Sequence, residues 1–414
     1  MRTVVATGRT TTPSAACGAG GRDAYEGRMD VVSSEMSYLG YNMNEAWGVT
    51  WKVYTTDPAL KPTETFRQLY AVADIFGDVT GSTLSNNYHG LYTFGGHCMN
   101  ISGNTVTDNV GYGLDPHDDS DYLVIDSNIV ARNGYEGLIC AEFCDHLTIT
   151  NNDVYGNGQS GIMLYQATND SLVEGNRSYD NAVGGIAVLD SHRNTIRNNT
   201  LTNNAFAAIY FTVGSSDNIV EGNTLTGATT GSSSGYAVYT NGRGSDVPLD
   251  GGDGRVRRNQ FRDNRISGSK TPVLKLYEAS DSRFDGNSIT GPASSTAFDL
   301  IRGLENVISD TTYAGGITTH VKSTGSSALS ATTTVEDGEV GKTIKVRLDT
   351  YSTIELRDTR NLVWRMAGTL NGARAGQVSS QTLTYATAGS SKDVTTLDFA
   401  VRPGNGTVTV VPTS

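Results

Sequence analysis

Three short stretches of the sequence decide the fold, because they repeat at a fixed spacing. Residues 101–106 read ISGNTV, residues 125–130 read IDSNIV and residues 149–154 read ITNNDV. All three have the pattern apolar-x-x-Asn-x-apolar, with its asparagine at Asn104, Asn128 and Asn152. It recurs at Asn199 and Asn223, and a degenerate copy that ends in Ser178 places Asn176 before these two. Two further series run in phase with it, namely Asn109, Asn133, Asn157, Asn181 and Asn204, and Gly90, Gly113, Gly137, Gly161 and Gly185. A sustained period of this length is typical of a repeat architecture.

Each repeat contains short runs that favour β-strands. Examples are YLVIDS at 122–127 and NIVAR at 128–132, which are separated from their neighbours by Asn, Asp or Gly. No stretch of ten or more residues has helical periodicity, which disfavours helical repeats. The pattern therefore predicts a right-handed parallel β-helix, in which asparagines of successive coils bond along the stack and an inward column is formed by Leu91, Leu114, Leu138, Ile162 and Ile186.

The last quarter of the chain has a different pattern. The repeat stops near KSTGSSALSATTT at 322–334, which we interpret as a linker. Beyond it, runs such as KTIKVRLD at 342–349 alternate in the manner of antiparallel strands. The fold class predicted is all-β: a catalytic β-helix over residues 1–325, followed by a small β-sandwich-like module over 326–414. We expect this module to cap the open end of the helix.

Composition excludes several kinds of partner. The chain has 31 Lys and Arg against 43 Asp and Glu, a formal charge of −12, so it is a poor binder of nucleic acid. No run of about 18 apolar residues is present, so no membrane span is expected. The first twenty residues lack the apolar core of a signal peptide. Cys140 and Cys144 are spaced either for a disulfide across a turn or for the core, and the sequence leaves both open.

One coil has titratable residues at strand positions where the neighbouring coils have apolar ones. Residues 112–119 read YGLDPHDD, whereas the outward positions of neighbouring coils hold Ile139, Met163 and Ala187. A phenol, an imidazole and several carboxylates on one flat strand face would form a titratable cluster on a groove. A merely polar turn is the alternative, but a turn does not need a tyrosine and three acids there. We therefore interpret this coil as the functional site.

The same residues carry a resemblance to a known family. YGLDPHDDS at 112–120 resembles the Tyr-Gly-aliphatic-Asp-Pro-His-Asp/Glu signature of the bacterial mannuronan C5-epimerases, above all the periplasmic branch that acts in alginate biosynthesis. The similarity extends upstream through SYLGYNMNEAWGV and GSTLSNNYHGLYTF, and covers roughly residues 25–225. It implies a β-helix that acts on an anionic polysaccharide, converting β-D-mannuronate to α-L-guluronate within the polymer.

The resemblance also implies roles for the residues of this coil. Removing the weakly acidic C5 proton needs a base on one face of the sugar, an acid on the other, and a group that neutralises the carboxylate. By motif position, His117 and Tyr112 are the expected base and acid pair. Which of them abstracts the proton depends on the orientation of the sugar ring, and we predict His117 as the base and Tyr112 as the proton donor. Asp115 would orient or tune one of them, and Asp118 completes the catalytic group.

Two arginines that the family uses to neutralise the substrate carboxylate are missing. Where the periplasmic branch has its arginine, this chain has Glu142. Where the secreted branch has its arginine, this chain has Gln159. Three possibilities stay open for the neutralising charge. A Ca²⁺ ion held by Asp118, Asp119 and Glu142 would supply positive charge. Alternatively Arg67 or Lys52 would reach over from the preceding excursion, or the neutralisation is lost.

The remaining substrate-binding candidates flank this coil. His89 and Glu136 occupy the position of Tyr112 on the two neighbouring coils. Tyr92 and Tyr165 are expected to face the same groove, where aromatic rings would stack on sugars, although both also suit ordinary surface. Arg67, Lys52, Glu142 and Gln159 complete this set.

Three functions remain in competition. The first is C5-epimerisation of a polyuronate. The second is a polysaccharide lyase, which takes the same proton and then expels the C4 oxygen, with His89, Tyr112 or Glu136 as the acid. The third is a non-catalytic polysaccharide-binding β-helix, since this fold hosts many activities. The acidic charge and the fold class together indicate a secreted or periplasmic protein.

Overall fold

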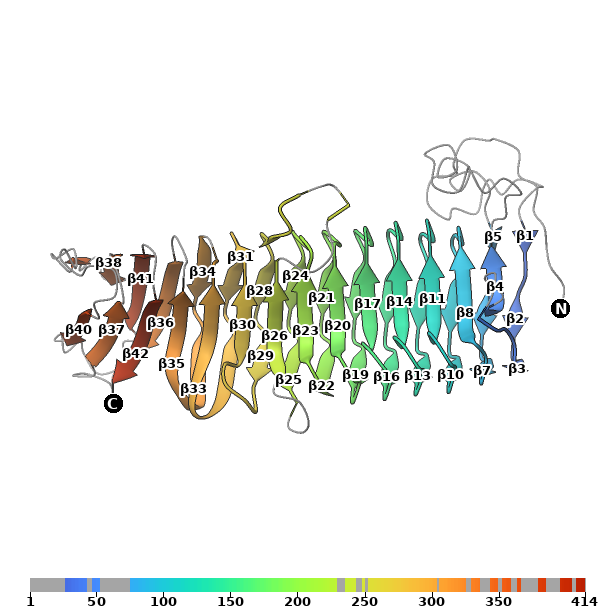
Figure 1. Ribbon diagram of the computed structural model, residues 1–414, viewed down its shortest axis with the longest axis horizontal. Coiled ribbons are helices and arrows are strands. Elements are labelled where there is room, and N and C mark those ends of the chain that lie inside the picture. The colour runs from blue at the N-terminus through green and yellow to red at the C-terminus, as the bar shows by residue number, and fades with distance from the viewer. Residues whose placement is uncertain are drawn as a thin grey trace. The chain divides into compact units, whose positions relative to one another are not determined.

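The computed structural model describes most of the chain up to residue 324 and the strands beyond it. The described ranges are 27–42, 47–52, 75–228, 235–242, 248–249, 252–303 and 305–324, followed by seven strands of which the backbone alone is described. Every element in these ranges is a β-strand (Figure 1). No helix long and apolar enough to cross a membrane occurs among them. The predicted all-β class is confirmed.

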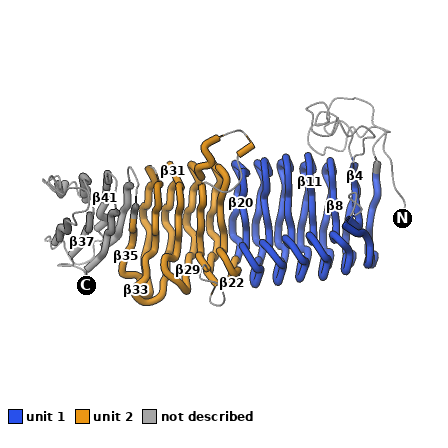
Figure 2. Tube along the Cα trace, in the orientation of Figure 1, with its two compact units in different colours: residues 1–200 blue, residues 201–414 orange. Residues whose placement is uncertain are grey.

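The chain forms two compact units, residues 1–200 and 201–414, which are described separately (Figure 2). In the first unit the strands fall into three parallel columns. The first column, which we call the site column because Asp115 and His117 lie on it, contains β4 (Gly48–Lys52), β8 (His89–Phe94), β11 (Leu114–His117), β14 (Leu138–Ala141), β17 (Ile162–Tyr165) and β20 (Gly184–Leu189). The second contains β3 (Glu35–Ser37), β7 (Thr83–Ser85), β10 (Thr105–Thr107), β13 (Ile129–Ala131), β16 (Asp153–Tyr155) and β19 (Arg177–Tyr179). The third contains β2 (Val31–Val32), β6 (Val79–Thr80), β9 (Asn100–Ser102), β12 (Val124–Asp126), β15 (Thr148–Thr150), β18 (Leu172–Glu174) and β21 (Thr195–Arg197), while β1 (Gly27–Arg28) pairs with β5 (Ile75–Phe76).

The asparagine ladders hold successive coils in register. The side-chain amide of Asn128 donates to Asn152 Oδ1 at 2.9 Å and to the carbonyl of Ile101 at 2.8 Å, while its own oxygen accepts from the amide of Asn104. Equivalent bonds run from Asn109 through Asn133, Asn157 and Asn181. These amides are buried, so each bond satisfies polar groups that would otherwise be costly to enclose. The predicted hydrogen bonding along the stack is confirmed.

The glycine series places the backbone of one coil close to the next. At Gly113, a Cβ atom would lie 2.4 Å from the carbonyl oxygen of Gly137 and 2.7 Å from the amide nitrogen of Asn133. No larger residue fits without moving one of these groups. The glycine therefore fixes the backbone directly after Tyr112, the first residue of the candidate site.

The interior of each coil is apolar, as the inward columns predict. The column Leu91, Leu114, Leu138, Ile162 and Ile186 is fully buried. Cys140 and Cys144 are both free and fully buried, so the core interpretation is the correct one and no disulfide joins them. Cys98 is in a disulfide.

The second unit repeats the parallel arrangement. Its site-type column contains β23 (Ala207–Thr212), β26 (Tyr236–Asn241) and β30 (Leu274–Tyr277), which pairs with the long strand β33 (Ser288–Ile301) and through it with β35 (Thr312–Thr324). The other strands are β22 (Thr200–Asn204), β25 (Thr224–Gly227), β29 (Arg265–Ser267), β24 (Ile219–Glu221), β28 (Gln260–Arg262), β32 (Arg283–Asp285), β34 (Asn306–Ser309), β27 (Val256–Arg257) and β31 (Ala279–Ser280). Asparagine bonds recur here, from Asn223 to Asn264 and on to Asn287.

Strand pairing changes from parallel to antiparallel in the last part of the chain. β36 (Leu329–Val335) is parallel to β34 but antiparallel to β41 (Thr395–Pro403). The other strands of this antiparallel part are β37 (Thr343–Leu348), β38 (Ser352–Asp358), β39 (Val363–Arg365), β40 (Ser379–Thr384) and β42 (Thr407–Thr413). The expected linker at 322–334 is wrong in part, because the end of β35 and most of β36 lie there. Its Ser and Thr residues suit a strand once partners on both sides take up the backbone hydrogen bonds. The predicted domain boundary at 325 stays a prediction.

Candidate active site

The candidate site lies on β11 of the first unit, where the titratable cluster was expected. Leu114 and Pro116 point into the coil and are buried, so the alternate residues Asp115 and His117 project from the opposite face of the strand. In the parallel register Asp115 pairs with Tyr92 and His117 with Phe94 on the preceding coil. The two following coils offer apolar residues in the Asp115 column, so within these three coils an acid occurs in this column only at Asp115.

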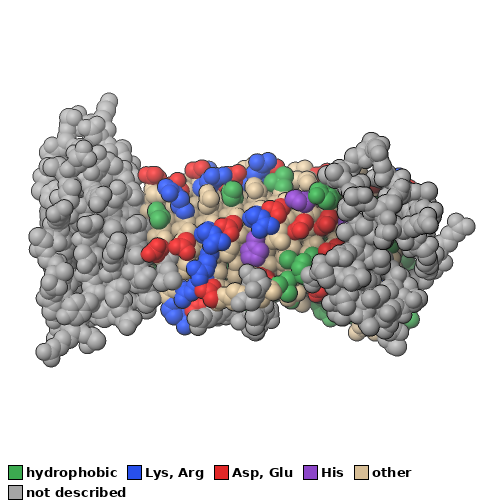
Figure 3. Space-filling view, turned by 90° about the horizontal axis from the view of Figure 1, so that it is seen from above, with side chains coloured by type: hydrophobic (Ala, Val, Ile, Leu, Met, Phe, Trp, Pro, Cys, Tyr) green, Lys and Arg blue, Asp and Glu red, His purple; other side chains and the backbone are tan. Residues whose placement is uncertain are grey.

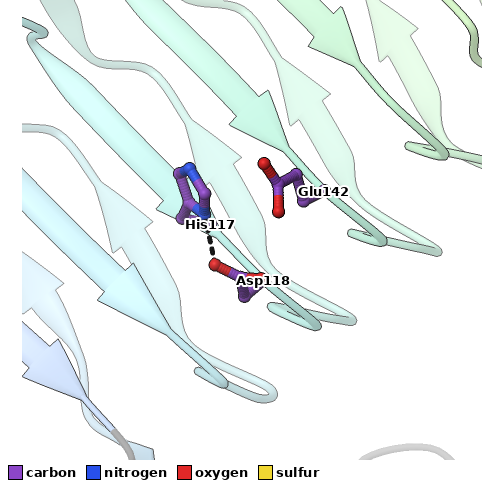
Figure 4. Close-up of side chains that lie close together, drawn as sticks. All are labelled: His117, Asp118 and Glu142. Carbon is purple, nitrogen blue, oxygen red and sulfur yellow. Dashed lines mark hydrogen bonds and ion pairs between the residues drawn. The ribbon is translucent and has the colours of Figure 1, made fainter. Parts of the chain in front are cut away.

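His117 and Asp118 form a close pair. Nδ1 of His117 lies 2.5 Å from Oδ2 of Asp118 (Figure 4). Burial lowers the pKa of His117, but the hydrogen bond that the ring donates to Asp118 and the charges of Asp115, Asp118 and Glu142 outweigh it, so the pKa is raised above the ordinary 6.5. With Nδ1–H donating to the carboxylate, the lone pair of the neutral ring is directed to Nε2. His117 is therefore built to accept a proton at Nε2.

The Asp118→Asn variant is expected to lower the pKa of the His117 imidazole. The change removes the carboxylate of Asp118, which raises the pKa of His117 both through its hydrogen bond and through its charge. Burial, which lowers the pKa, stays. The imidazole should then lose its proton at a lower pH than in the wild type. An NMR titration of the His117 ring measures this, with Asp118→Glu as the variant that keeps the charge. An unshifted midpoint in Asp118→Asn would show that Asp118 does not control the ring.

Asp115 is a buried carboxyl group whose oxygens make no hydrogen bond to any described residue. Its side chain is 1% exposed. Burial, together with the charges of Glu136 and Asp118 and against that of His117, raises the pKa of Asp115 to about 7. A group of this kind is costly to the fold when it is ionised. Its retention beside His117 marks a site built for protonation or ligand binding.

His89 fixes the backbone before Tyr112. The backbone N–H of Tyr112 donates to Nδ1 of His89 at 3.0 Å, and the two rings stack with centroids 4.9 Å apart. Burial, and then the charge of His117, lower the pKa of His89 to about 4, so the ring is neutral. Nδ1 also lies 3.9 Å from Asp115 Oδ2, but a nitrogen that accepts a hydrogen bond carries no proton, so this contact is no ion pair.

Tyr112 is kept as a neutral phenol. Burial, and then the charges of Asp115 and Glu136, raise its pKa well above the ordinary 10. Glu136 follows on the next coil and is 5% exposed; burial raises its pKa to about 7, against two backbone hydrogen bonds that lower it. The phenol of Tyr112 therefore interacts with two carboxyl groups, Asp115 and Glu136, whose pKa values both lie near neutral pH.

Lys52 is the cation that the described residues bring to this face. It pairs in register with Phe94, which pairs in turn with His117. Nζ of Lys52 lies 4.8 Å above the Phe94 ring, and that ring lies 6.3 Å from the His117 ring at an interplanar angle of 9°. Lysine, phenylalanine and histidine thus follow one another along one column. Arg67, the other expected cation, lies outside the described residues.

Glu142 comes close to His117 and Asp118. One ligand atom of each of these three residues lies within 4.8 Å of the others (Figure 4). Asp119, the third expected calcium ligand, does not belong to this group. A calcium ion prefers six to eight oxygen ligands. Two carboxylates and an imidazole match it poorly, so oxygens from a bound polymer would have to complete the shell.

The remaining expected substrate contacts differ in how exposed their side chains are. Gln159 is exposed, on the coil after Glu136, and Tyr165 is half-buried in the column of His117, two coils on. Tyr92 is only 1% exposed and packs edge-on against Trp47 at 4.6 Å, so its ring is covered.

Two aromatic residues of the site were missed from the sequence. Trp47 also contacts His89, at 5.1 Å, but it precedes the regular repeat and so had no register to place it. Tyr135 is 41% exposed, with its ring 5.3 Å from that of Tyr112. Its position directly before Glu136 in the repeat was the available signal.

Comparisons with known proteins agree with this architecture. The family described as "Right handed beta helix region" matches residues 74–225, and "Periplasmic copper-binding protein (NosD)" matches 173–310. The mannuronan C5-epimerase AlgG of Azotobacter vinelandii is 33% identical over 111 residues, 27% of this chain and 19% of that protein. The mannuronan C5-epimerase of Pseudomonas aeruginosa is 30% identical over 113 residues, 27% and 18% of the two chains. The resemblance to mannuronan C5-epimerases is confirmed, over about a fifth of the length of these relatives.

A solved structure shows the same fold. The periplasmic alginate epimerase AlgG superimposes with a TM-score of 0.52 at 23% identity, over 61% of this chain and 60% of that one. The chain is thus a parallel β-helix similar to alginate epimerases.

Proposed function

We propose that this protein epimerises β-D-mannuronate to α-L-guluronate at C5 within a polyuronate chain. The observation that carries the proposal is that one coil presents both an imidazole, His117, whose Nδ1 is bound to Asp118, and a neutral phenol, Tyr112. The matching signature in the mannuronan C5-epimerases supports the choice of substrate class. The anionic polysaccharide would lie along the face of the site column.

The reaction follows from the protonation states. In its unprotonated form His117 takes the C5 proton at Nε2, and the electron pair of the C–H bond moves into the carboxylate to give an enolate dianion. Tyr112 then donates its phenolic proton to the opposite face of C5, which inverts the centre. The phenolate left behind is reprotonated from Asp115 or Glu136, whose pKa values are about 7. His117 releases its proton to solvent, the carboxylate that reprotonated Tyr112 takes a proton from solvent, and the site is restored.

The enolate needs a neutralising charge, and we propose Lys52 for this role. Lys52 lies in the column of Phe94 and His117, and an ammonium group is charged at neutral pH. Calcium bound through Asp118 and Glu142 is the second possibility, with oxygens of the polymer as further ligands. The two are separable, because a chelator removes calcium and leaves Lys52 in place.

The test is proton NMR of polymannuronate incubated with the protein in D₂O, alongside absorbance of unsaturated uronates. We expect guluronate signals with deuterium at C5 and no rise in absorbance. Activity that survives EDTA and is lost in Lys52→Met assigns the neutralising charge to Lys52; the reverse assigns it to calcium. No guluronate and no absorbance change with polymannuronate would contradict the proposal.

A polysaccharide lyase is the second candidate, and Glu136 favours it. A lyase must protonate the departing C4 oxygen, and a buried carboxyl group with a pKa of about 7 beside Tyr112 can deliver that proton. Rising absorbance without guluronate would establish this function instead. A non-catalytic polysaccharide-binding protein would bind the polymer and give neither signal.

We also propose that the protein is exported to the periplasm or secreted. The relatives of known structure are named as periplasmic epimerases, and the substrate class is an extracellular polymer. The disulfide of Cys98 suits an oxidising compartment. Fractionation of the native host, followed by immunodetection of the protein, tests the location.

A further inference from the structure

The second unit carries a cluster of aromatic side chains on the outward face of β23, β26 and β30. Its members are Phe206, Tyr210, Tyr236, Tyr239 and Tyr277, which surround Lys275, and we call this set the tyrosine platform. The register aligns Tyr210 with Tyr239 and Tyr239 with Lys275. Residues from three successive coils therefore meet on one surface.

The rings contact one another at varied angles. Tyr236 and Tyr239 are nearly parallel, with centroids 5.4 Å apart, while Phe206 meets Tyr239 edge-on at 4.7 Å. Tyr277 lies 6.4 Å from Tyr239 on the other side. All platform rings are half-buried, so part of each remains accessible. The inward aromatic residues of the same unit, Phe261 and Phe284, are fully buried, as expected for rings that serve only the core.

Lys275 stands among these rings and forms no ion pair with any residue that the structure describes. Its Nζ lies 3.4 Å from the hydroxyl of Tyr236, 5.5 Å from the centre of that ring and 5.2 Å from the centre of the Tyr277 ring. Burial lowers the pKa of Lys275, but the hydrogen bond and the neighbouring tyrosines outweigh this, so the lysine stays charged. Asp299 is its register partner on the next coil, but the ion pair of Asp299 is with Lys322, at 3.9 Å.

Other cations of this chain are used differently. Surface arginines such as Arg258 and Arg262 are bound to Asp217 and Glu221 at 2.7 Å, and basic side chains lie beside acidic ones on the face shown in Figure 3. Such pairs compensate their own charge. Lys275 instead contacts tyrosine rings and the hydroxyl of Tyr236, and the charge of Asp299 acts on it without an ion pair between the two, which leaves it able to bind an anion.

We infer that the tyrosine platform is a second carbohydrate-binding site, which takes acidic sugar residues of a polyuronate. Aromatic rings stack against the C–H faces of pyranoses, and phenol hydroxyls reach the sugar hydroxyls. The ammonium group of Lys275 pairs with the uronate carboxylate. The polymer class rests on the proposed function, whereas the site itself shares no residue with the catalytic coil.

The experiment is calorimetry with short polymannuronate oligomers in EDTA, using the His117→Gln protein so that the ligand is not altered. We expect Lys275→Gln and Tyr239→Ala each to weaken one class of sites about tenfold or to remove it from the stoichiometry. Arg265→Gln is the matched control, because it removes one unpaired exposed cation of the same unit outside the platform. It should change affinity less than about twofold. Lys275→Arg should retain most binding.

The outcomes separate this inference from the proposed function. Unchanged affinity and stoichiometry in both Lys275→Gln and Tyr239→Ala overturn the inference, as does equal weakening by Arg265→Gln or no binding to the parent. Neutral mannan oligomers that bind with the same dependence on Lys275 would overturn the assignment to acidic sugars. Lys275-dependent binding without any epimerisation by the wild type would contradict the proposed function alone.

Discussion

His117→Gln is expected to lower the rate of guluronate formation by roughly 10³-fold, within the range that a general base supplies. Glutamine keeps a polar side chain beside Asp118 but has no nitrogen lone pair with which to take the C5 proton. Tyr112→Phe should cause a comparable loss, since it deletes only the phenolic oxygen that returns the proton. The measurement is the initial rate of guluronate appearance by NMR at saturating polymannuronate.

The controls for this result keep the fold and the binding surface. Neither variant should lose thermal stability or polymer binding by more than a small margin, because both side chains lie on the outward face of the coil. His146→Gln serves as the matched control: His146 stacks on Tyr122 at 4.8 Å and belongs to no part of the candidate site. If His117→Gln retained wild-type activity while binding polymer normally, His117 would not be the base.

Asp115→Asn is expected to raise thermal stability at about pH 8 while lowering activity about 10²-fold. In the folded protein the pKa of Asp115 is about 7, against an ordinary 3.8. The folded state therefore binds the proton more tightly than the unfolded chain. Stability falls as the pH rises from the ordinary value through about 7, since the buried carboxylate must then ionise without a partner. Asparagine cannot ionise, so the variant escapes this loss.

The pH dependence makes the prediction specific. At about pH 4 the aspartyl and asparaginyl proteins should unfold at similar temperatures, and at about pH 8 the variant should unfold a few degrees higher. Asp126→Asn is the matched control, because Asp126 is hydrogen-bonded to Thr150, Asn151 and Ser127 and its pKa is lowered. That variant should lose stability slightly at about pH 8. A lower unfolding temperature for Asp115→Asn at both pH values would show that the carboxylate stabilises the fold.

Much of the fold could be read from the sequence, because a β-helix repeats the same local problem in every coil. Asn128 must satisfy the same backbone groups as Asn104 and Asn152, and Gly113 must accept the same close approach as Gly90. Local chemistry therefore recurs at a constant spacing and reveals the strands, the inward columns and the coil that departs from them. The stretch at 322–334 misled for the same reason: outside the repeat, Ser and Thr suit a linker or a strand, and pairing with distant β41 decides.

The candidate site, too, was predicted from the sequence only in part. The sequence by itself determined the coil that carries His117, Tyr112 and Asp115, and the position of His89 and Glu136 beside Tyr112, because parallel register follows from the repeat. Only the tertiary structure decided that Asp115 is enclosed without a hydrogen-bond partner among the described residues, that Trp47 covers Tyr92, and that Lys275 lies among tyrosines without an ion pair in the described part of the chain. Burial and charge compensation depend on side chains brought together from separate coils, and no spacing within one coil encodes them.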